Sequence, residues 1–461
     1  MTLEAGPQTV TTTDAQGTVG TVGTVGTVEA PRRGRWIDVW DPEDATFWAG
    51  KGRAIARRNL WPSIFAEFLG FSVWQLWSIV VVSMPKAGFG YDTNQLFWLV
   101  ALPSLVGATL RLPYTFAVPR FGGRNWTVFS ALLLLVPTAG LAYFMTRPDT
   151  PFWLMALVAA TAGVGGGNFA SSMTNISFFY PEKEKGFALG INAAGGNLGV
   201  AVVQLVVPIV IVAGAGLSLN RAGLMWLPLI VLAAFWAWKV MANLSVANSS
   251  FRTSIAAAKR PHTWVISFLY IGTFGSFIGF GAAFPLLIKT TFPDITPAHF
   301  AFLGALVGSV ARPFGGKLSD RVGGAWITVC SFVVMGLGIL AAIVSLNSGS
   351  FAAFLISFLV LFVASGAANG STYRMIPAVF RLTTPNDLGR ARREAAACIG
   401  IASAVGAYGG FLVPRGFAMS TSHFGSLIPA LYVFCGFYVL CLAVTYFCYL
   451  RKGGPLSQER V

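Results

Sequence analysis

Charged side chains are scarce in this sequence. They make up 11% of its 461 residues, whereas soluble proteins contain about 25%. Acidic residues are the fewest, with 17 Asp and Glu in total, and the mean hydropathy is +0.67. So few charges cannot cover the apolar surface of a soluble chain of this length. The composition therefore excludes a soluble fold and predicts an all-α membrane protein that crosses the bilayer many times.

Residues that bind metals or perform catalysis are also few. The five cysteines lie in apolar stretches without metal-ligand spacing, and the three histidines lie at the ends of such stretches. There is no paired set of carboxylates, no Ser/His/Asp grouping and no phosphate-binding loop. We therefore expect no enzyme, cofactor or metal. The net charge of +15 lies in short clusters between apolar stretches, which argues against nucleic-acid binding.

Apolar sequence is abundant and falls into twelve stretches, each close to the roughly 20 residues that a membrane helix needs. The widest connection between them divides the stretches six and six. We therefore predict two six-helix bundles, at 60–244 and 263–450, joined by a cytoplasmic linker at 245–262. The predicted helices span 60–84, 94–118, 126–146, 152–180, 186–213, 222–243, 264–288, 298–316, 325–346, 351–380, 396–419 and 426–450.

The segments outside the bundles are predicted from their composition. Residues 1–59 form a cytoplasmic tail with an interfacial segment, and 451–461 form a second cytoplasmic tail. The repetitive stretch 17–28 is typical of disorder, while residues 32–58 combine Trp and Arg in a manner typical of the membrane surface. With the N-terminus inside, the cytoplasmic segments hold 23 Lys and Arg and the outer loops hold four. Both termini are therefore predicted to be cytoplasmic.

An internal repeat relates the two halves. RLPYTFAVPRFGG at 111–123 and RPFGGKLSDRVGG at 312–324 align without a gap at an offset of 201, and the same offset aligns Asn168 with Asn369. Repeated halves of six helices are typical of secondary transporters, whose substrate site lies between the repeats near the middle of the membrane. The pattern argues against a receptor or a channel.

The first residues of the two repeats, Arg111 and Arg312, are the candidate substrate ligands. Pseudo-symmetry places them facing each other across a central cavity. The alternative is that they cap helix ends or pair with Asp320. Glu67 is the only carboxylate inside a predicted stretch, and arginine does not lose its proton on burial. A bound anion is therefore the simplest compensation, and the pair predicts an anionic substrate.

Glycine is the second abundant feature, with 52 residues. The fifth and eleventh stretches are rich in it. Small residues allow close helix packing, and such contacts are also candidates for the surfaces on which the halves slide. We assign this conformational role to Gly190, Gly195, Gly196, Gly199, Gly406 and Gly409.

Three long motifs give the chain a family resemblance: GNFASSMTNISFFYPEKEKGFALGINAAGGNLG, GTFGSFIGFGAAFP and RPFGGKLSDRVGG. Together with RNLWPS and MPKAGFG near the first stretch, they closely resemble the nitrate/nitrite porter family of the NarK type, a branch of the major facilitator superfamily. The resemblance runs from about Trp36 to the last stretch. It implies the major facilitator fold of twelve helices and transport of nitrate and nitrite by alternating access.

The resemblance also implies a binding site. In that family the anion lies between two arginines, which match Arg111 and Arg312. One phenylalanine from each of the first, fourth and seventh helices encloses it. The positions that match the family's enclosing, hydrogen-bonding and signature residues are Phe71, Phe169, Phe274, Asn197, Tyr270, Gly400 and Ser403.

The resemblance leaves the mode of coupling open. One branch of the family exchanges nitrate for nitrite, and another is thought to take up nitrate with protons. Glu67 in the first stretch and a short loop between the tenth and eleventh favour the proton-coupled branch, with Glu67 as the proton-coupling candidate. Antiport is the alternative, and a proton-coupled porter for another small anion is a more distant one. We expect a monomer in the bacterial cytoplasmic membrane.

Overall fold

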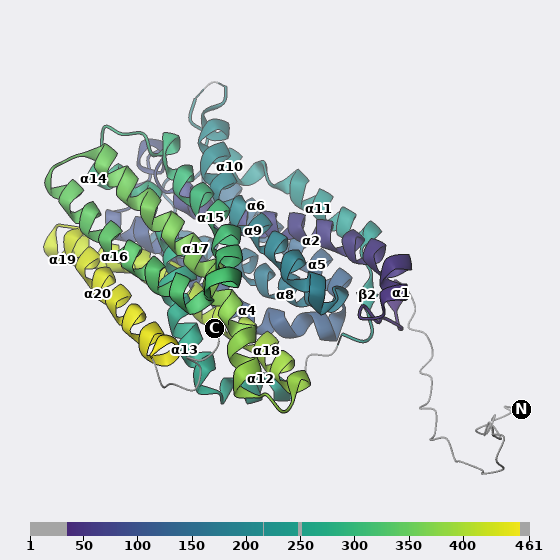
Figure 1. Cartoon of the computed structure of the whole chain (residues 1–461). Coiled ribbons are helices and arrows are strands. Elements are labelled where there is room, and N and C mark those ends of the chain that lie inside the picture. The colour runs from purple at the N-terminus through teal and green to yellow at the C-terminus, as the bar shows by residue number, and fades with distance from the viewer. Residues whose placement is uncertain (1–34, 215, 248–250, 452–461) are drawn as a thin grey trace, which may run out of the picture.

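The computed structural model describes residues 35–214, 216–247 and 251–451. Helices cover all twelve predicted stretches (Figure 1), and ten of these segments are long and apolar enough to cross a membrane. The other two contain α2 (Arg53–Trp74) and α15 (Ala301–Val322), where four charged residues each lower the mean hydropathy. The chain is thus an all-helical, multi-pass membrane protein. The predictions for residues 1–34 and 452–461 lie outside the described residues.

The first half contains six membrane segments, coloured purple to teal in Figure 1. Four of them are divided by a one- or two-residue interruption. The first segment begins at Arg53, seven residues earlier than predicted, and its Asn59 accepts the backbone N–H of Ala242. The segments are α2 with α3 (Leu76–Val80), α4 (Thr93–Phe121), α5 (Gly123–Leu133) with α6 (Leu135–Phe144), α7 (Phe152–Thr161) with α8 (Gly163–Phe179), α9 (Glu182–Val212), and α10 (Arg221–Leu224) with α11 (Leu227–Val240).

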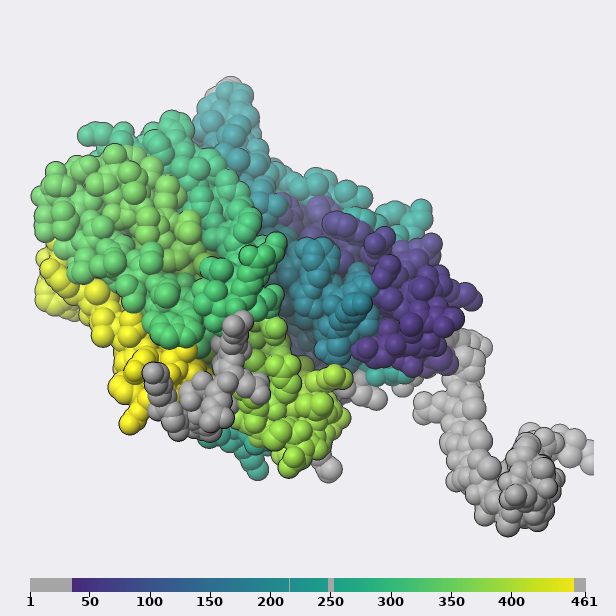
Figure 2. Space-filling model, in the orientation of Figure 1, coloured from purple at the N-terminus to yellow at the C-terminus, as the bar shows by residue number. Residues whose placement is uncertain are grey.

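The second half, green to yellow, lies beside the first (Figure 1). Along the boundary α15 packs against α9 (Figure 2). Its segments are α13 (Pro261–Tyr270), the π-helical turn η3 (Ile271–Gly275) and α14 (Ser276–Thr291); α15; α16 (Gly324–Asn347); α17 (Phe351–Thr383); α18 (Leu388–Ala407) with α19 (Gly409–Phe424); and α20 (Ile428–Thr445) with η5 (Tyr446–Leu450). The π-turn lies in the seventh segment, and such turns are frequent at functional sites.

The segment before α2 packs on protein, and its position at the membrane surface stays a prediction. Strand β1 (Trp36–Ile37) pairs in parallel with β2 (Asn243–Leu244), and α1 (Ala45–Phe47) and η1 (Trp48–Gly52) follow. Trp40 donates to the carbonyl oxygen of Phe178 at 3.1 Å. Trp40 and Trp48 are buried against Phe179 and Tyr180. This segment therefore joins the ends of α8 and α11.

The repeat is visible in the packing of its two arginine helices. Helix α4 packs against α8 as α15 packs against α17. One turn before each arginine stands a glycine on which a Cβ would meet an aromatic side chain, 2.6 Å from Trp74 at Gly107 and 2.7 Å from Phe277 at Gly308. Both positions therefore require glycine for close approach of the helices.

Five of the six glycines predicted as sliding contacts do not lie at the boundary between the two halves. Those at 195, 196 and 199 face α2, and those at 406 and 409 face α13 and η3, so each set packs inside its own half. A Cβ on Gly199 would lie 2.4 Å from the carbonyl oxygen of Phe68. A Cβ on Gly190 would have no neighbour within 4 Å. Five of the six therefore hold helices of one half together in this conformation. The conformational role of Gly190, Gly195, Gly196, Gly199, Gly406 and Gly409 stays a prediction.

Two glycines of α9 provide a matched test of this assignment. Gly199→Ala should lower the free energy of unfolding by about 1–3 kcal/mol, because its methyl group overlaps the backbone of α2. Gly190→Ala should be neutral or slightly stabilising, because the space around it is open and alanine favours helix. Thermal unfolding of the purified variants in detergent measures both. Equal stability of the two variants would contradict the packing role.

Candidate functional site

Arg111 is completely buried in α4 and is held from both halves. Its Nε donates to the carbonyl oxygen of Gly166 on α8 at 3.1 Å, and its Nη1 donates to that of Ser403 on α18 at 2.8 Å. The guanidinium carbon lies 4.6 Å from the ring centre of Phe169 and 5.0 Å from that of Phe274, within cation–π distance. Its Nη2 is buried and has no protein partner.

The three predicted phenylalanines lie together. Phe71 and Phe169 have ring centres 6.0 Å apart. Phe169 and Phe274 are stacked across the boundary between the halves, 6.3 Å apart and inclined by 24°. Tyr270 stacks on Phe274 at 5.3 Å, and all four rings are buried. The structure therefore brings together an aromatic stack that surrounds Arg111 and excludes water from it.

Arg312, on α15, is the second buried guanidinium. It is 7% exposed, and its carbon lies 5.4 Å from the ring centre of Tyr373 on α17. Tyr373 lies 5.1 Å from Tyr270, which stacks on the Phe274 ring beside Arg111, so one aromatic cluster connects the two arginines. The Nη1 of Arg312 is buried without a protein partner.

Neither arginine has an acid in direct contact among the described residues. Arg111 and Arg312 form no ion pair within the described residues, and Asp320 pairs with Arg374 instead. The alternative in which Asp320 neutralises the pair is therefore wrong. Two positive charges with unused N–H donors remain beside aromatic faces. Such a site can bind a small anion through charge and in-plane hydrogen bonds.

The remaining predicted ligands differ in how they are placed. The side-chain amide of Asn197 on α9 is buried and has no hydrogen-bond partner on either atom. The hydroxyl of Ser403 donates to the carbonyl oxygen of Gly400 at 2.9 Å, so Ser403 meets Arg111 through its backbone. Gly400 faces Thr115 of α4, and a Cβ there would be in ordinary contact at 3.7 Å.

Glu67 lies in a separate polar chamber inside the first half. Its Oε2 accepts a hydrogen bond from Asn192 at 2.6 Å, and Asn192 also donates to Ser172. Its Oε1 is buried without a partner, as is the whole amide of Asn168. A cavity of about 10 Å³ lies beside these groups and is lined also by Ser63. That is room for about one water molecule, and Glu67 interacts electrostatically with both arginines.

Sequence reasoning missed two polar neighbours of the site. The hydroxyl of Tyr270 donates to Asn369 at 2.6 Å, and Tyr373 lies 5.1 Å from the ring of Tyr270. Asn369 is the repeat equivalent of Asn168, and Tyr373 follows it by one helical turn, so both lie on one face of α17. That spacing could have identified them. Glu394 is a further buried acid, just before the predicted eleventh stretch.

The halves are fastened together on one side of the site. Four side-chain hydrogen bonds join them within the described part of the chain: Arg111 to Ser403, Thr109 to Tyr408 at 2.9 Å, Gln204 to Gly281 at 2.7 Å and Arg415 to Asn94 at 2.7 Å. Apart from the bond of Arg111 itself, all lie toward the end of the helices that is predicted to be extracellular. Arg415 also stacks on Trp98 at 3.9 Å. We call the Arg415, Asn94 and Trp98 contact the outer seal.

Comparison with known proteins identifies the family. Residues 60–292 match the model of the Major Facilitator Superfamily. The chain is 43% identical over 445 residues to the nitrate/nitrite transporter NarU of Salmonella typhimurium, covering 90% of this chain and 96% of the relative. It is 37% identical over 451 residues to the probable nitrate/nitrite antiporter NarK2 of Thermus thermophilus, covering 91% and 98%.

A solved structure agrees in fold. That of a D-xylose-proton symporter superposes with a TM-score of 0.66 at 15% identity, covering 87% of this chain and 99% of the other. These relatives are transporters, so the expectation that the chain is not an enzyme is confirmed. With a family model over half of its length and relatives alike over nine tenths of it, this chain belongs to the Major Facilitator Superfamily and, within it, to the nitrate/nitrite porters.

Proposed function

We propose that this chain carries nitrate and nitrite across the membrane as a secondary transporter. The observation that carries the proposal is the pair of buried guanidinium groups of Arg111 and Arg312. Each has one terminal nitrogen without a hydrogen-bond acceptor among the described residues. The names of its relatives support the choice of anion. The two arginines bind the anion from opposite halves.

The surroundings of the arginines favour a small planar ion. Two guanidinium planes supply charge and in-plane N–H donors, and the faces of Phe169 and Phe274 form the walls of a thin, dry slot. A flat ion fits such a slot, whereas a tetrahedral phosphate does not. Tyr270, whose hydroxyl donates to Asn369, stands beside these rings, and exclusion of water strengthens the attraction. The remaining wall of the proposed site is formed by Phe71, Asn197, Gly400 and Ser403.

Transport proceeds by alternating access between the domains 60–244 and 263–450. The outer seal holds one side closed. The excess of Lys and Arg supports a cytoplasmic position for the opposite side and for both termini. With that orientation, the described conformation is closed toward the outside. The protein works as a monomer in the bacterial cytoplasmic membrane.

Charge counting favours symport of nitrate with a proton. The two arginines contribute +2. The site carries +1 when nitrate is bound and Glu67 is protonated, and again +1 when it is empty and Glu67 is ionised. The empty, protonated form carries +2, which is costly to occlude in a low-dielectric site. If the carrier changes between its inward-facing and outward-facing states only when the site has a net charge of +1, nitrate and a proton are transported together.

Two alternative transport functions would use the same site. A nitrate/nitrite antiporter uses the same two arginines, needs no proton carrier, and corresponds to the name of one relative. A proton-coupled porter for another small anion requires a substrate that fits the same slot. Uptake into proteoliposomes separates the three, because only symport concentrates nitrate on a pH gradient without internal nitrite.

The first property to test is the planar guanidinium group of the two arginines, which presents several N–H donors at once. Arg111→Lys and Arg312→Lys should each abolish measurable nitrate binding, a loss of about a hundredfold or more, although the charge is kept. Binding to the purified protein is measured by calorimetry. Arg147→Lys in an outer loop is the control and should bind normally. Near-normal affinity in either site variant would show that the arginines are structural.

Substitution of Glu67 tests whether nitrate uptake is coupled to protons. Glu67→Gln should lose pH-driven net nitrate uptake and keep nitrate/nitrite exchange, because the empty carrier then stays at +2 while the loaded carrier stays at +1. Both activities are measured in the same proteoliposomes, with and without internal nitrite. A variant that still concentrates nitrate on a pH gradient would remove Glu67 from the coupling. Loss of exchange as well would indicate a packing role.

Disruption of the outer seal tests whether the protein alternates between states that are open to opposite sides of the membrane. Arg415→Ala removes one hydrogen bond and one cation–π contact between the halves, and it should shift the population toward outward opening by about tenfold. The readout is the alkylation rate of Ser104→Cys by an impermeant reagent added outside, after subtraction of labelling of the native cysteines. Arg147→Ala should leave the rate unchanged. An unchanged rate in Arg415→Ala would mean that other contacts close this side.

A further inference from the structure

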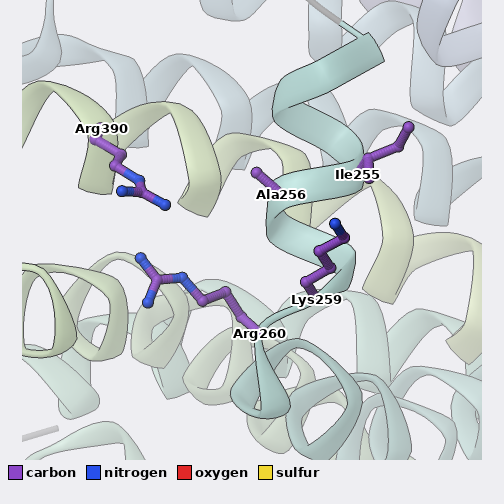
Figure 3. Close-up of a pocket in the computed structure, with 5 residues that line it drawn as sticks. All are labelled: Ile255, Ala256, Lys259, Arg260 and Arg390. Carbon is purple, nitrogen blue, oxygen red and sulfur yellow. The ribbon is translucent and has the colours of Figure 1, made fainter.

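A basic pocket lies far from the anion site, where the linker meets the second half. It is lined by Ile255, Ala256, Lys259, Arg260 and Arg390, and its volume is about 450 Å³, within the roughly 300–1,000 Å³ range of ligand pockets. Figure 3 shows the guanidinium groups of Arg260 and Arg390 pointing toward each other across it. Three of the five lining residues are basic and none is acidic.

A buried acid holds these arginines in place. The carboxylate of Glu394, 1% exposed, accepts from Nε of Arg260 at 2.8 Å and from Nε of Arg390 at 2.7 Å. Arg260 also donates through Nη2 to Thr384 at 3.1 Å. Both oxygens of Glu394 are occupied by Nε atoms, so the outer edge of the Arg390 guanidinium remains available. With Lys259, three cations stand against Glu394 and the nearby Asp387, which accepts the backbone N–H of Arg390 at 2.8 Å, so the group keeps a net charge of +1.

Apolar side chains stand exposed around the pocket. Ile255 of α12 (Phe251–Ala258) is 42% exposed, and Trp264 at the start of α13 is 55% exposed. The indole N–H of Trp264 donates to the carbonyl oxygen of Ala258 at 2.8 Å, so the ring is fixed beside the end of α12. A tryptophan next to basic residues is typical of the membrane–water interface. The pocket therefore has a cationic floor and an edge suited to hydrocarbon.

We propose that this pocket binds the phosphate headgroup of an anionic phospholipid of the cytoplasmic leaflet and thereby fastens α12 to α18. The inference uses the orientation proposed above, but it does not depend on the transported substrate. Basic pockets between membrane helices on the cytoplasmic side are suited to such headgroups. Helix α12 packs against α18, and α18 carries the Ser403 carbonyl that holds Arg111. The lipid therefore stabilises the linker on the helix that reaches the anion site.

The test is lipid-dependent thermal unfolding of the full-length protein in neutral detergent. Phosphatidylglycerol should raise the unfolding midpoint, and phosphatidylcholine at the same mole fraction should not. Lys259→Gln should raise the mole fraction needed for the half-maximal shift about fivefold. It leaves both Glu394 ion pairs intact, and normal nitrate binding in phosphatidylcholine shows that it is folded. Lys183→Gln, an exposed lysine outside the pocket, is the matched control and should behave as wild type.

The other outcomes overturn the proposal. Equal shifts with the two lipids would mean that no anionic headgroup is recognised. Equal losses in Lys259→Gln and Lys183→Gln would reduce the effect to general surface charge. Inorganic phosphate that reproduces the shift at millimolar concentration would assign the pocket to a free anion. Arg390→Gln provides a second variant, which should lose the phosphatidylglycerol effect more strongly than Lys259→Gln does.

Discussion

A guanidinium group buried in a membrane remains positively charged, because arginine keeps its proton under all conditions that a protein meets. Arg111 and Arg312 bring two such charges to the boundary between the halves, and no acid within the described residues pairs with them. The structure reduces their cost through cation–π contacts and backbone carbonyl groups. In the proposed function, the substrate anion meets the rest of this cost and completes the site.

The same two residues connect binding to movement. Arg111 on α4 donates to the backbone of α18 in the other half, and Phe169 and Phe274 stack across the same boundary. Each half therefore supplies one charge and one wall of the slot. In the proposed mechanism, separation of the halves on either side changes the anion's contacts. Packing within a half resists deformation, because a Cβ on Gly199 or Gly409 would lie only 2.3–2.4 Å from backbone atoms of the neighbouring helix. The halves can thus move as rigid units around a shared ligand.

Sequence patterns predicted the parts of this structure that repeat or that follow from burial. Hydropathy predicted the twelve segments, and the offset of 201 paired the two arginines before any contact was known. The glycines show the limit of such reasoning. A glycine in a helix indicates close approach, but the approaching element is decided by tertiary packing, and five of the six face their own half. Tyr373 was missed for a different reason: one aromatic residue among 38 Phe, 14 Trp and 11 Tyr carries no signal alone, and only its spacing from Asn369 singles it out.

One site can serve both an exchanger and a symporter, and the difference is a matter of charge. With nitrate or nitrite bound, the two arginines retain one net positive charge, and a carrier without an acid can cross only in that loaded form. An ionised carboxylate within electrostatic reach gives the empty carrier the same net charge. Glu67 lies in a polar chamber inside the first half, close enough to both arginines for their charges to act on it. It can therefore adjust the charge of the site without contacting the substrate, and the anion-binding residues need not change between the two modes of transport.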